Sequence, residues 1–179
     1  MKTKEFQYIL KNKADFALFY NSDSINQNVN MFYFSGYRGL GALILPRKKA
    51  PFLIVPDMEF QRAKKYMIKK VYAMEKKKFF ESIYKIVKRN GLKTRNIAID
   101  KNRFTLNSYK NFKKQFKNTK TKDVYLDCSK LRSIKTESEI QILKKSCDYA
   151  DKILQKTIKN FKSFKTESEA SAFLEYETK

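Results

Sequence analysis

Residues 31–56, MFYFSGYRGLGALILPRKKAPFLIVP, hold three of the chain's four glycines and all three of its prolines. Short apolar runs alternate here with turn-forming residues, which is typical of strands joined by tight connections. The spacing predicts three strands that pair as an antiparallel meander, at Met31 to Ser35, Ala42 to Leu45 and Phe52 to Val55. Each proline lies where a strand needs no ladder hydrogen bond, which supports this assignment.

Apolar periodicity outside this stretch predicts alternating helices and strands. Toward the N-terminus, a helix over Lys4 to Lys11 precedes a buried strand at Phe16 to Tyr20. Toward the C-terminus, Asp57 is expected to cap a helix with Met58, Ala63 and Met67 on one side. The further expected strands are Val71 to Met74, Ile97 to Asp100 and Val124 to Leu126, and the further expected helices are Phe79 to Arg89 and Leu106 to Phe116. Seven candidate strands with interspersed helices predict an α/β fold with a mixed sheet.

The pattern changes after residue 130. Thr136 and Glu139 have the spacing of a capping box, and a helix of about 24 residues follows them. Its apolar stripe is formed by Ile140, Leu143, Cys147, Ala150, Leu154 and Ile158. A second box, at Thr166 and Glu169, opens another helix. We expect two regions, residues 1–130 and 131–179, and the stripe to need a partner surface outside the first region, with hairpin packing on that region as the alternative.

The charge balance allows two interpretations. The chain has 40 lysines and arginines against 18 acidic residues, a formal charge of +22. Such an excess suggests a polyanionic partner. However, most of it is lysine, spread along the chain in short runs such as Lys113-Lys114 and Lys144-Lys145. Because nucleic-acid surfaces favour arginine forks and exposed aromatics, we favour a solvated surface and keep polyanion binding as the alternative.

Composition also narrows the chemistry. The chain has no histidine, which removes the commonest general base and metal ligand. Cys128 and Cys147 lack the spacing of a zinc site, so both are expected to be buried free thiols. No apolar run approaches the roughly 20 residues of a membrane span, and the first residues do not resemble a signal peptide. The expected location is cytoplasmic.

Several segments match patterns of one protein family. Asn30 to Tyr37 is similar to N-x-Y-Y-F-S-G, and Phe52 to Phe60 is similar to L-x-V-P-x-L-E-Y. The best match, LRSIKTESEI, is similar to L-R-x-I-K-[ST]-x-x-E-I and gives a domain-linker motif of Leu131, Arg132, Lys135, Thr136, Glu139 and Ile140. In this order, the segments resemble the amino-terminal half of the prolidase and aminopeptidase P metallopeptidases related to creatinase, most closely the archaeal-type prolidases.

The resemblance implies a fold and an absence. The implied fold is the creatinase N-terminal domain, a mixed six-stranded sheet flanked by helices with a ribonuclease H-like topology, followed by a long linker helix. The family's catalytic domain binds two divalent metal ions through residues downstream of Lys179. We therefore assign no catalytic residue, metal ligand or cofactor to this chain, and Asp123, Asp127 and Asp148 are not taken as ligands. Two divalent metal ions are expected only in the missing catalytic domain.

The resemblance also implies a role for the first region. This domain builds the family's dimer, and its loop after the F-S-G pattern limits entry to the partner's active site. In this sequence the substrate-gating loop comprises Gly36, Tyr37, Arg38, Gly39 and Gly41. Arg38 is expected at its tip, where a guanidinium fork suits the terminal carboxylate of a dipeptide, while the alternative is a solvated arginine.

Three functions stay open. In the first, the chain is a non-catalytic, split or truncated half of an Xaa-Pro dipeptidase or aminopeptidase, acting as a homodimer or with a separately encoded catalytic subunit. In the second, it is a catalytically inactive protein-interaction module of the same fold. In the third, it is a basic nucleic-acid-binding protein. No membrane partner is expected.

Overall fold

The computed structural model describes residues 2–23, 27–75 and 78–179. The chain divides into two compact units, a first unit of Met1–Ser133 and a second unit of Ile134–Lys179.

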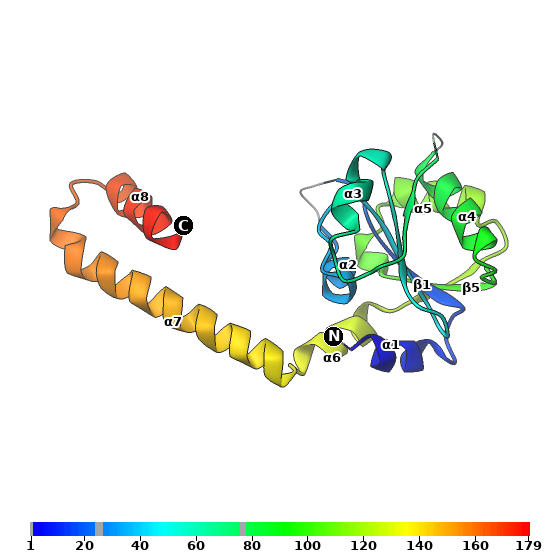
Figure 1. Ribbon diagram of the computed structural model, residues 1–179, viewed down its shortest axis with the longest axis horizontal. Coiled ribbons are helices and arrows are strands. Elements are labelled where there is room, and N and C mark those ends of the chain that lie inside the picture. The colour runs from blue at the N-terminus through cyan, green and yellow to red at the C-terminus, as the bar shows by residue number, and fades with distance from the viewer. Residues whose placement is uncertain (1, 24–26, 76–77) are drawn as a thin grey trace. The chain divides into compact units, whose positions relative to one another are not determined.

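The first unit contains a six-stranded sheet (Figure 1). Its strands lie in the order β4-β3-β2-β1-β5-β6. Its strands are β1 (Phe16–Asn21), β2 (Gly41–Pro46), β3 (Phe52–Val55), β4 (Val71–Ala73), β5 (Asn96–Ile99) and β6 (Lys120–Asp123). Its helices are α1 (Thr3–Leu10), α2 (Val29–Ser35), α3 (Phe60–Ala63), α4 (Phe79–Arg89), α5 (Leu106–Gln115) and α6 (Tyr125–Ser133), with 3-10 turns η1 (Asp57–Glu59) and η2 (Lys101–Arg103).

Strand β1 lies at the centre of the sheet. It pairs antiparallel with β2, with Phe16 opposite Pro46, and parallel with β5, with Phe16 opposite Ile97. Strands β2 and β3 pair antiparallel, whereas β3–β4 and β5–β6 pair parallel. The predicted mixed six-stranded sheet is therefore confirmed.

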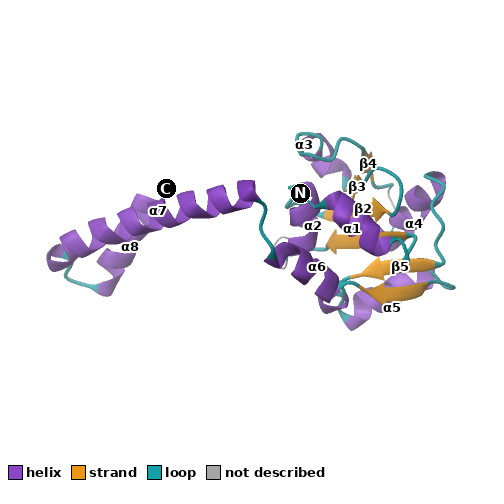
Figure 2. Ribbon diagram, turned by 90° about the horizontal axis from the view of Figure 1, so that it is seen from below, coloured by secondary structure: helices purple, strands orange, loops and turns teal. Residues whose placement is uncertain are grey.

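Side chains of β1 alternate between two hydrophobic layers, as a strand covered on both faces requires. Ala17 and Phe19 point into a cluster with residues of α1, α2 and α6. Phe16, Leu18 and Tyr20 point into a second cluster with residues of α4 and α5. In the view of Figure 2, α1 lies in front of the strands and α4 and α5 lie behind them.

The expected strand at Met31 to Ser35 is wrong, because this segment is helix α2. The Asn28 side chain caps the helix by accepting hydrogen bonds from the Asn30 and Met31 N–H groups, at 2.9 and 3.2 Å. Buried Met31 and Phe34 then lie on one helical face, a spacing that a strand would split between two faces. The meander consequently uses Phe16–Asn21 as its first strand.

The expected strand at Val124 to Leu126 is also wrong. Strand β6 is four residues earlier, and Tyr125 begins α6. Asp123 Oδ1 accepts the Tyr125 N–H at 3.0 Å, which turns the chain from strand into helix. Strand β6 is a largely exposed edge strand of sequence KTKD, so it carries no apolar alternation that the sequence could reveal.

The helix expected after Asp57 is shorter than predicted, and Asp57 does not cap it. The segment forms the 3-10 turn η1 behind Pro56 and then the four residues of α3. Ala63 is buried, but Met58 and Met67 are 87% and 52% exposed. Met58, Ala63 and Met67 therefore do not form the expected apolar face of a single helix.

The second unit contains α7 (Glu137–Asn160), a 3-10 turn η3 (Phe161–Ser163) and α8 (Glu167–Thr178). The capping box of α7 is confirmed, because the Thr136 N–H reaches Glu139 Oε2 at 2.7 Å and the Glu139 N–H reaches Thr136 Oγ1 at 3.3 Å. At α8 only half of the expected box forms, since the Glu169 carboxylate accepts the Lys165 N–H.

The two thiols have different environments. Cys128 is buried in the first unit, and desolvation raises the pKa of its thiol. Cys147 is exposed on α7, so the prediction of two buried thiols is wrong for Cys147. Its neighbours on the apolar stripe of α7 are exposed as well, so no core of the second unit encloses it.

Within the described ranges, none of the helices is long and apolar enough to cross a membrane.

Candidate functional site

The loop from Gly36 to Gly41 leaves helix α2 through a left-handed turn. Gly36 has φ 71° and ψ −7°, and its N–H donates to the Phe32 carbonyl oxygen at 2.7 Å. A residue with a Cβ is strained at this φ, so the glycine ends the helix and reverses the chain. The reversal carries the loop back over the last turn of α2.

Tyr37 anchors the loop in the protein interior. Its side chain is fully buried, and its hydroxyl lies 2.8 Å from Glu59 Oε2 and 3.1 Å from the Leu40 carbonyl oxygen. The Tyr66 ring packs edge-on against it, with ring centroids 5.3 Å apart. Burial, and then the hydrogen bond to Glu59, raises the pKa of the Tyr37 hydroxyl far above its ordinary value. The hydroxyl has one hydrogen to donate, and both the Glu59 carboxylate and the Leu40 carbonyl oxygen lie within its reach.

Gly39 is required by the space around this anchor. A Cβ at Gly39 would lie 2.2 Å from the Tyr37 hydroxyl oxygen and 2.6 Å from Glu59 Oε2. The Gly39 carbonyl oxygen accepts the buried Asn21 side-chain N–H at 3.0 Å, which ties the loop to the end of β1. Glu59 is held in turn by Arg62, with Oε1 3.2 Å from Nη1.

Arg38 faces away from this anchor. It is exposed, and its Cζ lies 4.2 Å from the centroid of the Phe32 ring, over the ring face. Phe32 is itself 38% exposed. Among the residues that the structure describes, no carboxylate forms an ion pair with Arg38. The guanidinium thus contacts the Phe32 ring, and no acidic side chain among the described residues forms an ion pair with it.

A network of buried polar side chains joins α2 to the ends of two strands. Asn21 Oδ1 accepts the Asn28 N–H at 2.6 Å, and the Asn30 side-chain N–H donates to Asp100 Oδ2 at 2.8 Å. The Asn102 N–H donates to Asp100 Oδ1 at 3.2 Å. Burial raises the pKa of the Asp100 carboxyl. These bonds join α2 to the carboxyl ends of β1 and β5.

The domain-linker residues lie on either side of the boundary between the units. Leu131 is buried at the end of α6, and Arg132 donates to the Cys128 carbonyl oxygen at 3.4 Å. Thr136 and Glu139 form the capping box described above, and Lys135 and Ile140 flank Thr136 and Glu139 at the start of α7. The motif therefore ends one helix and opens the next.

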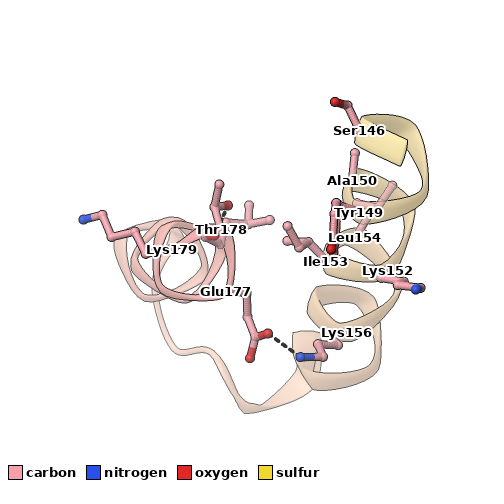
Figure 3. Close-up of a pocket in the computed structure, with 11 residues that line it drawn as sticks. Ser146, Tyr149, Ala150, Lys152, Ile153, Leu154, Lys156, Glu177, Thr178 and Lys179 are labelled. Atoms are coloured by element: carbon pink, nitrogen blue, oxygen red, sulfur yellow. Dashed lines mark hydrogen bonds and ion pairs between the residues drawn. The ribbon is translucent and has the colours of Figure 1, made fainter. Parts of the chain in front are cut away.

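The second unit has a cavity of about 830 Å³ between α7 and α8 (Figure 3). Figure 3 shows Tyr149, Ile153 and Leu154 on α7 beside the end of α8, and Lys156 paired with Glu177 across the gap. Much of α7 stays open to solvent, and Ile142, Leu154 and Ile158 are 66%, 54% and 65% exposed. In the part of α7 that the structure describes, only Thr157 is buried.

Charge is divided unevenly between the units. Residues 134–179 carry nine lysines against eight carboxylates, so 21 of the 22 net positive charges belong to residues 1–133. Among the described residues, no group of three or more aspartate, glutamate and cysteine side chains is placed to hold a metal ion.

The predicted loop residues fall into two sets. Tyr37, Gly39 and Gly41 form the buried side of the loop, and a Cβ at Gly41 would lie 2.5 Å from the Ile54 carbonyl oxygen. Arg38 is on the exposed side. The sequence did not predict two contact residues, Phe32 beneath Arg38 and Glu59 at the Tyr37 hydroxyl. The spacing of Asn28 and Gly36 could have identified α2 and hence Phe32, whereas no sequence signal pairs Tyr37 with Glu59.

Residues 7–134 match the family model described as the creatinase/prolidase N-terminal domain. The chain belongs to this family. The match ends within one residue of the boundary between the two units.

Relatives of this creatinase/prolidase domain are longer proteins. The Xaa-Pro dipeptidase of Pyrococcus furiosus is 35% identical over 159 residues, which cover 85% of this chain and 42% of that protein. The Xaa-Pro dipeptidase of Pyrococcus horikoshii is 32% identical over 97% of this chain and 46% of its own length. The crystal structure of the X-Pro aminopeptidase from Thermotoga maritima shares the fold, with a TM-score of 0.83 and 21% identity over 96% of this chain and 48% of that one. The chain thus spans about half the length of the relatives it matches.

The contacts of Gly39 predict the effect of its replacement. Gly39→Ala should lower the free energy of unfolding by about 1–3 kcal/mol, because its methyl group collides with the Tyr37 hydroxyl and the Glu59 carboxylate. Gly91→Ala is the matched control, since the nearest atom to its Cβ would be the Lys49 Nζ, at 3.6 Å, an ordinary contact distance. That variant has only the cost of a left-handed φ, about 1 kcal/mol. Urea denaturation followed by circular dichroism measures both, and a loss below about 0.5 kcal/mol for Gly39→Ala would show that the loop is not packed this way.

Proposed function

We propose that the chain is the non-catalytic N-terminal part of an Xaa-Pro dipeptidase or aminopeptidase, and that a region outside these 179 residues performs peptide hydrolysis. The observation that carries this proposal is the extent of the match. Identity of 32–35% to two Xaa-Pro dipeptidases runs along 85–97% of the chain but covers only 42–46% of each relative. The catalytic region would bind the two divalent metal ions. It would be either a separately encoded subunit or a further part of the same polypeptide.

The apolar surface of α7 supports a partner of this kind. Leu143, Leu154 and Ile158 belong to its predicted stripe and are 50%, 54% and 65% exposed. Isolated apolar side chains on a surface are ordinary, but a continuous row along a helix marks a surface that another polypeptide covers. We propose the catalytic region as that polypeptide, because these helices lie inside the segment aligned with the longer relatives.

The loop from Gly36 to Gly41 is the proposed gate. In a homodimer the loop of one subunit would limit access to the active site of its partner. Its buried side fixes the path of the backbone through Tyr37, and its exposed side presents Arg38. A guanidinium without an acidic partner suits the terminal carboxylate of a dipeptide.

Reconstitution tests this proposal. The purified chain should not hydrolyse an Xaa-Pro dipeptide, and it should form an active complex with the polypeptide of the same organism that corresponds to the second half of the relatives. Arg38→Ala should raise KM for the dipeptide about 10-fold, the loss expected for a charge-assisted hydrogen bond, because the carboxylate loses its fork. Arg38→Lys is the control that keeps the charge without the fork. Absence of a complex contradicts the split enzyme, and an unchanged KM for Arg38→Ala contradicts the gate.

The charge of the first unit favours one second candidate function, polyanion binding. Residues 1–133 carry a net charge of +21, whereas residues 134–179 are nearly neutral. If this surface binds nucleic acid, log K for a 20-nucleotide single strand should fall linearly as the logarithm of the salt concentration rises. The slope should be roughly one unit for each phosphate that the protein neutralises. Fluorescence anisotropy measures this slope. A lack of binding at about 100 mM salt would eliminate the candidate.

A further inference from the structure

The geometry points to Phe32 as a positioning residue that holds the Arg38 guanidinium ready for an incoming carboxylate. This inference rests on the proposed gating role of the loop and adds a residue to it. Phe32 belongs to α2 rather than to the loop, so it would not be found among the loop's own residues. Its ring lies under Arg38, with 4.2 Å between the ring centroid and Cζ.

The contact with Phe32 lies at the central carbon of the guanidinium. The five N–H groups of an arginine lie in the plane of the guanidinium, and a carboxylate binds them from the edge in that plane. The Phe32 ring contacts the guanidinium at its central carbon, 4.2 Å from the ring centroid, and the proposed role needs the N–H edge to stay accessible. The contact also restricts a side chain that would otherwise lose rotamer freedom when a ligand binds, so part of the ordering cost is removed in advance.

The backbone that carries the ring is held by a hydrogen bond. The Gly36 N–H donates to the Phe32 carbonyl oxygen at 2.7 Å, so the turn that leads to Arg38 is built on Phe32. Tyr37, the residue directly before Arg38, is fully buried. Arg38 therefore follows a hydrogen-bonded turn and a buried residue, and it forms no ion pair with the described carboxylates.

The helix beneath the ring does not depend on the ring. Helix α2 is held by Met31 and Phe34 in the core and by the Asn28 cap, while Phe32 is 38% exposed. Replacing Phe32 with leucine should therefore keep the helix and remove the aromatic face. Phe32→Tyr keeps the aromatic face and is the matched control.

The contact can be tested first in the chain alone. In the NMR spectrum of the Arg38 side chain, the ring current of Phe32 should shift the Nε–H proton. The shift should disappear in Phe32→Leu and persist in Phe32→Tyr. An Arg38 signal that is the same in Phe32→Leu and in the unaltered chain would overturn the inference, and backbone amide signals from the same spectra verify that α2 is intact.

The functional test compares a dipeptide with its C-terminal amide, using this chain combined with its catalytic region. Phe32→Leu should raise KM for the free acid about two- to fivefold, which is the affinity carried by an exposed cation–π contact. It should leave kcat and the KM of the amide unchanged, and Phe32→Tyr should restore the lower KM. If Arg38→Ala raises KM but Phe32→Leu does not, the inference fails and the proposed gate stands. If Arg38→Ala has no effect either, the gate fails together with the inference.

Discussion

The hydrogen bond from the Tyr37 hydroxyl to Glu59 is the interaction on which the shape of the candidate site depends. It draws a bulky side chain from an exposed loop into the interior and leaves no room for a side chain at Gly39. Tyr37 is buried, whereas its neighbour Arg38 is exposed. In the proposed gate, Gly36 therefore provides a left-handed turn and Gly39 provides space for the Tyr37 side chain.

Hydrogen bonds from the rest of the first unit hold the loop at Gly39 and helix α2 before it. Strand β1 is central to the sheet and buried on both faces, and its last residue, Asn21, binds both the Gly39 carbonyl oxygen and the Asn28 backbone. The Asn30–Asp100 bond then fixes α2 to the end of β5. These bonds join buried polar groups, and they favour one arrangement of loop and helix because breaking one would leave a buried polar group unpaired. The Asn30 side-chain oxygen is the exception, since it is buried without a hydrogen-bond partner among the described residues.

The sequence allowed the architecture to be predicted where the apolar period was strong. Helix Phe79 to Arg89 and the strand at Phe52 to Val55 have the predicted bounds, because each is long or apolar enough to show its period. Helix α2 was mistaken for a strand because its run of aromatic residues has strand propensity, while its cap and the packing of Met31 and Phe34 decide the helix. Strand β6 was missed because hydrogen bonds to β5 define it and its exposed side chains carry no pattern.

The candidate site was predictable only on the loop itself. Its residues follow from the resemblance, but Glu59 lies 22 residues beyond Tyr37, and only the folded chain brings them together. The role of Phe32 could not be predicted, because the expected strand at Met31 to Ser35 would place Phe32 away from Arg38. Contacts across such distances depend on tertiary packing, which no local pattern encodes.

Hydrogen exchange at the Gly36 and Tyr37 amides tests the central claim, the rigidity of the loop, most directly. The Gly36 N–H donates to the Phe32 carbonyl oxygen and the Tyr37 N–H donates to Ser35 Oγ at 3.1 Å. If Tyr37 anchors the loop, both amides should exchange at least about a hundredfold more slowly than in an unstructured peptide, as amides of a packed segment do. Exchange of both amides at the rate of an unstructured peptide would contradict the account.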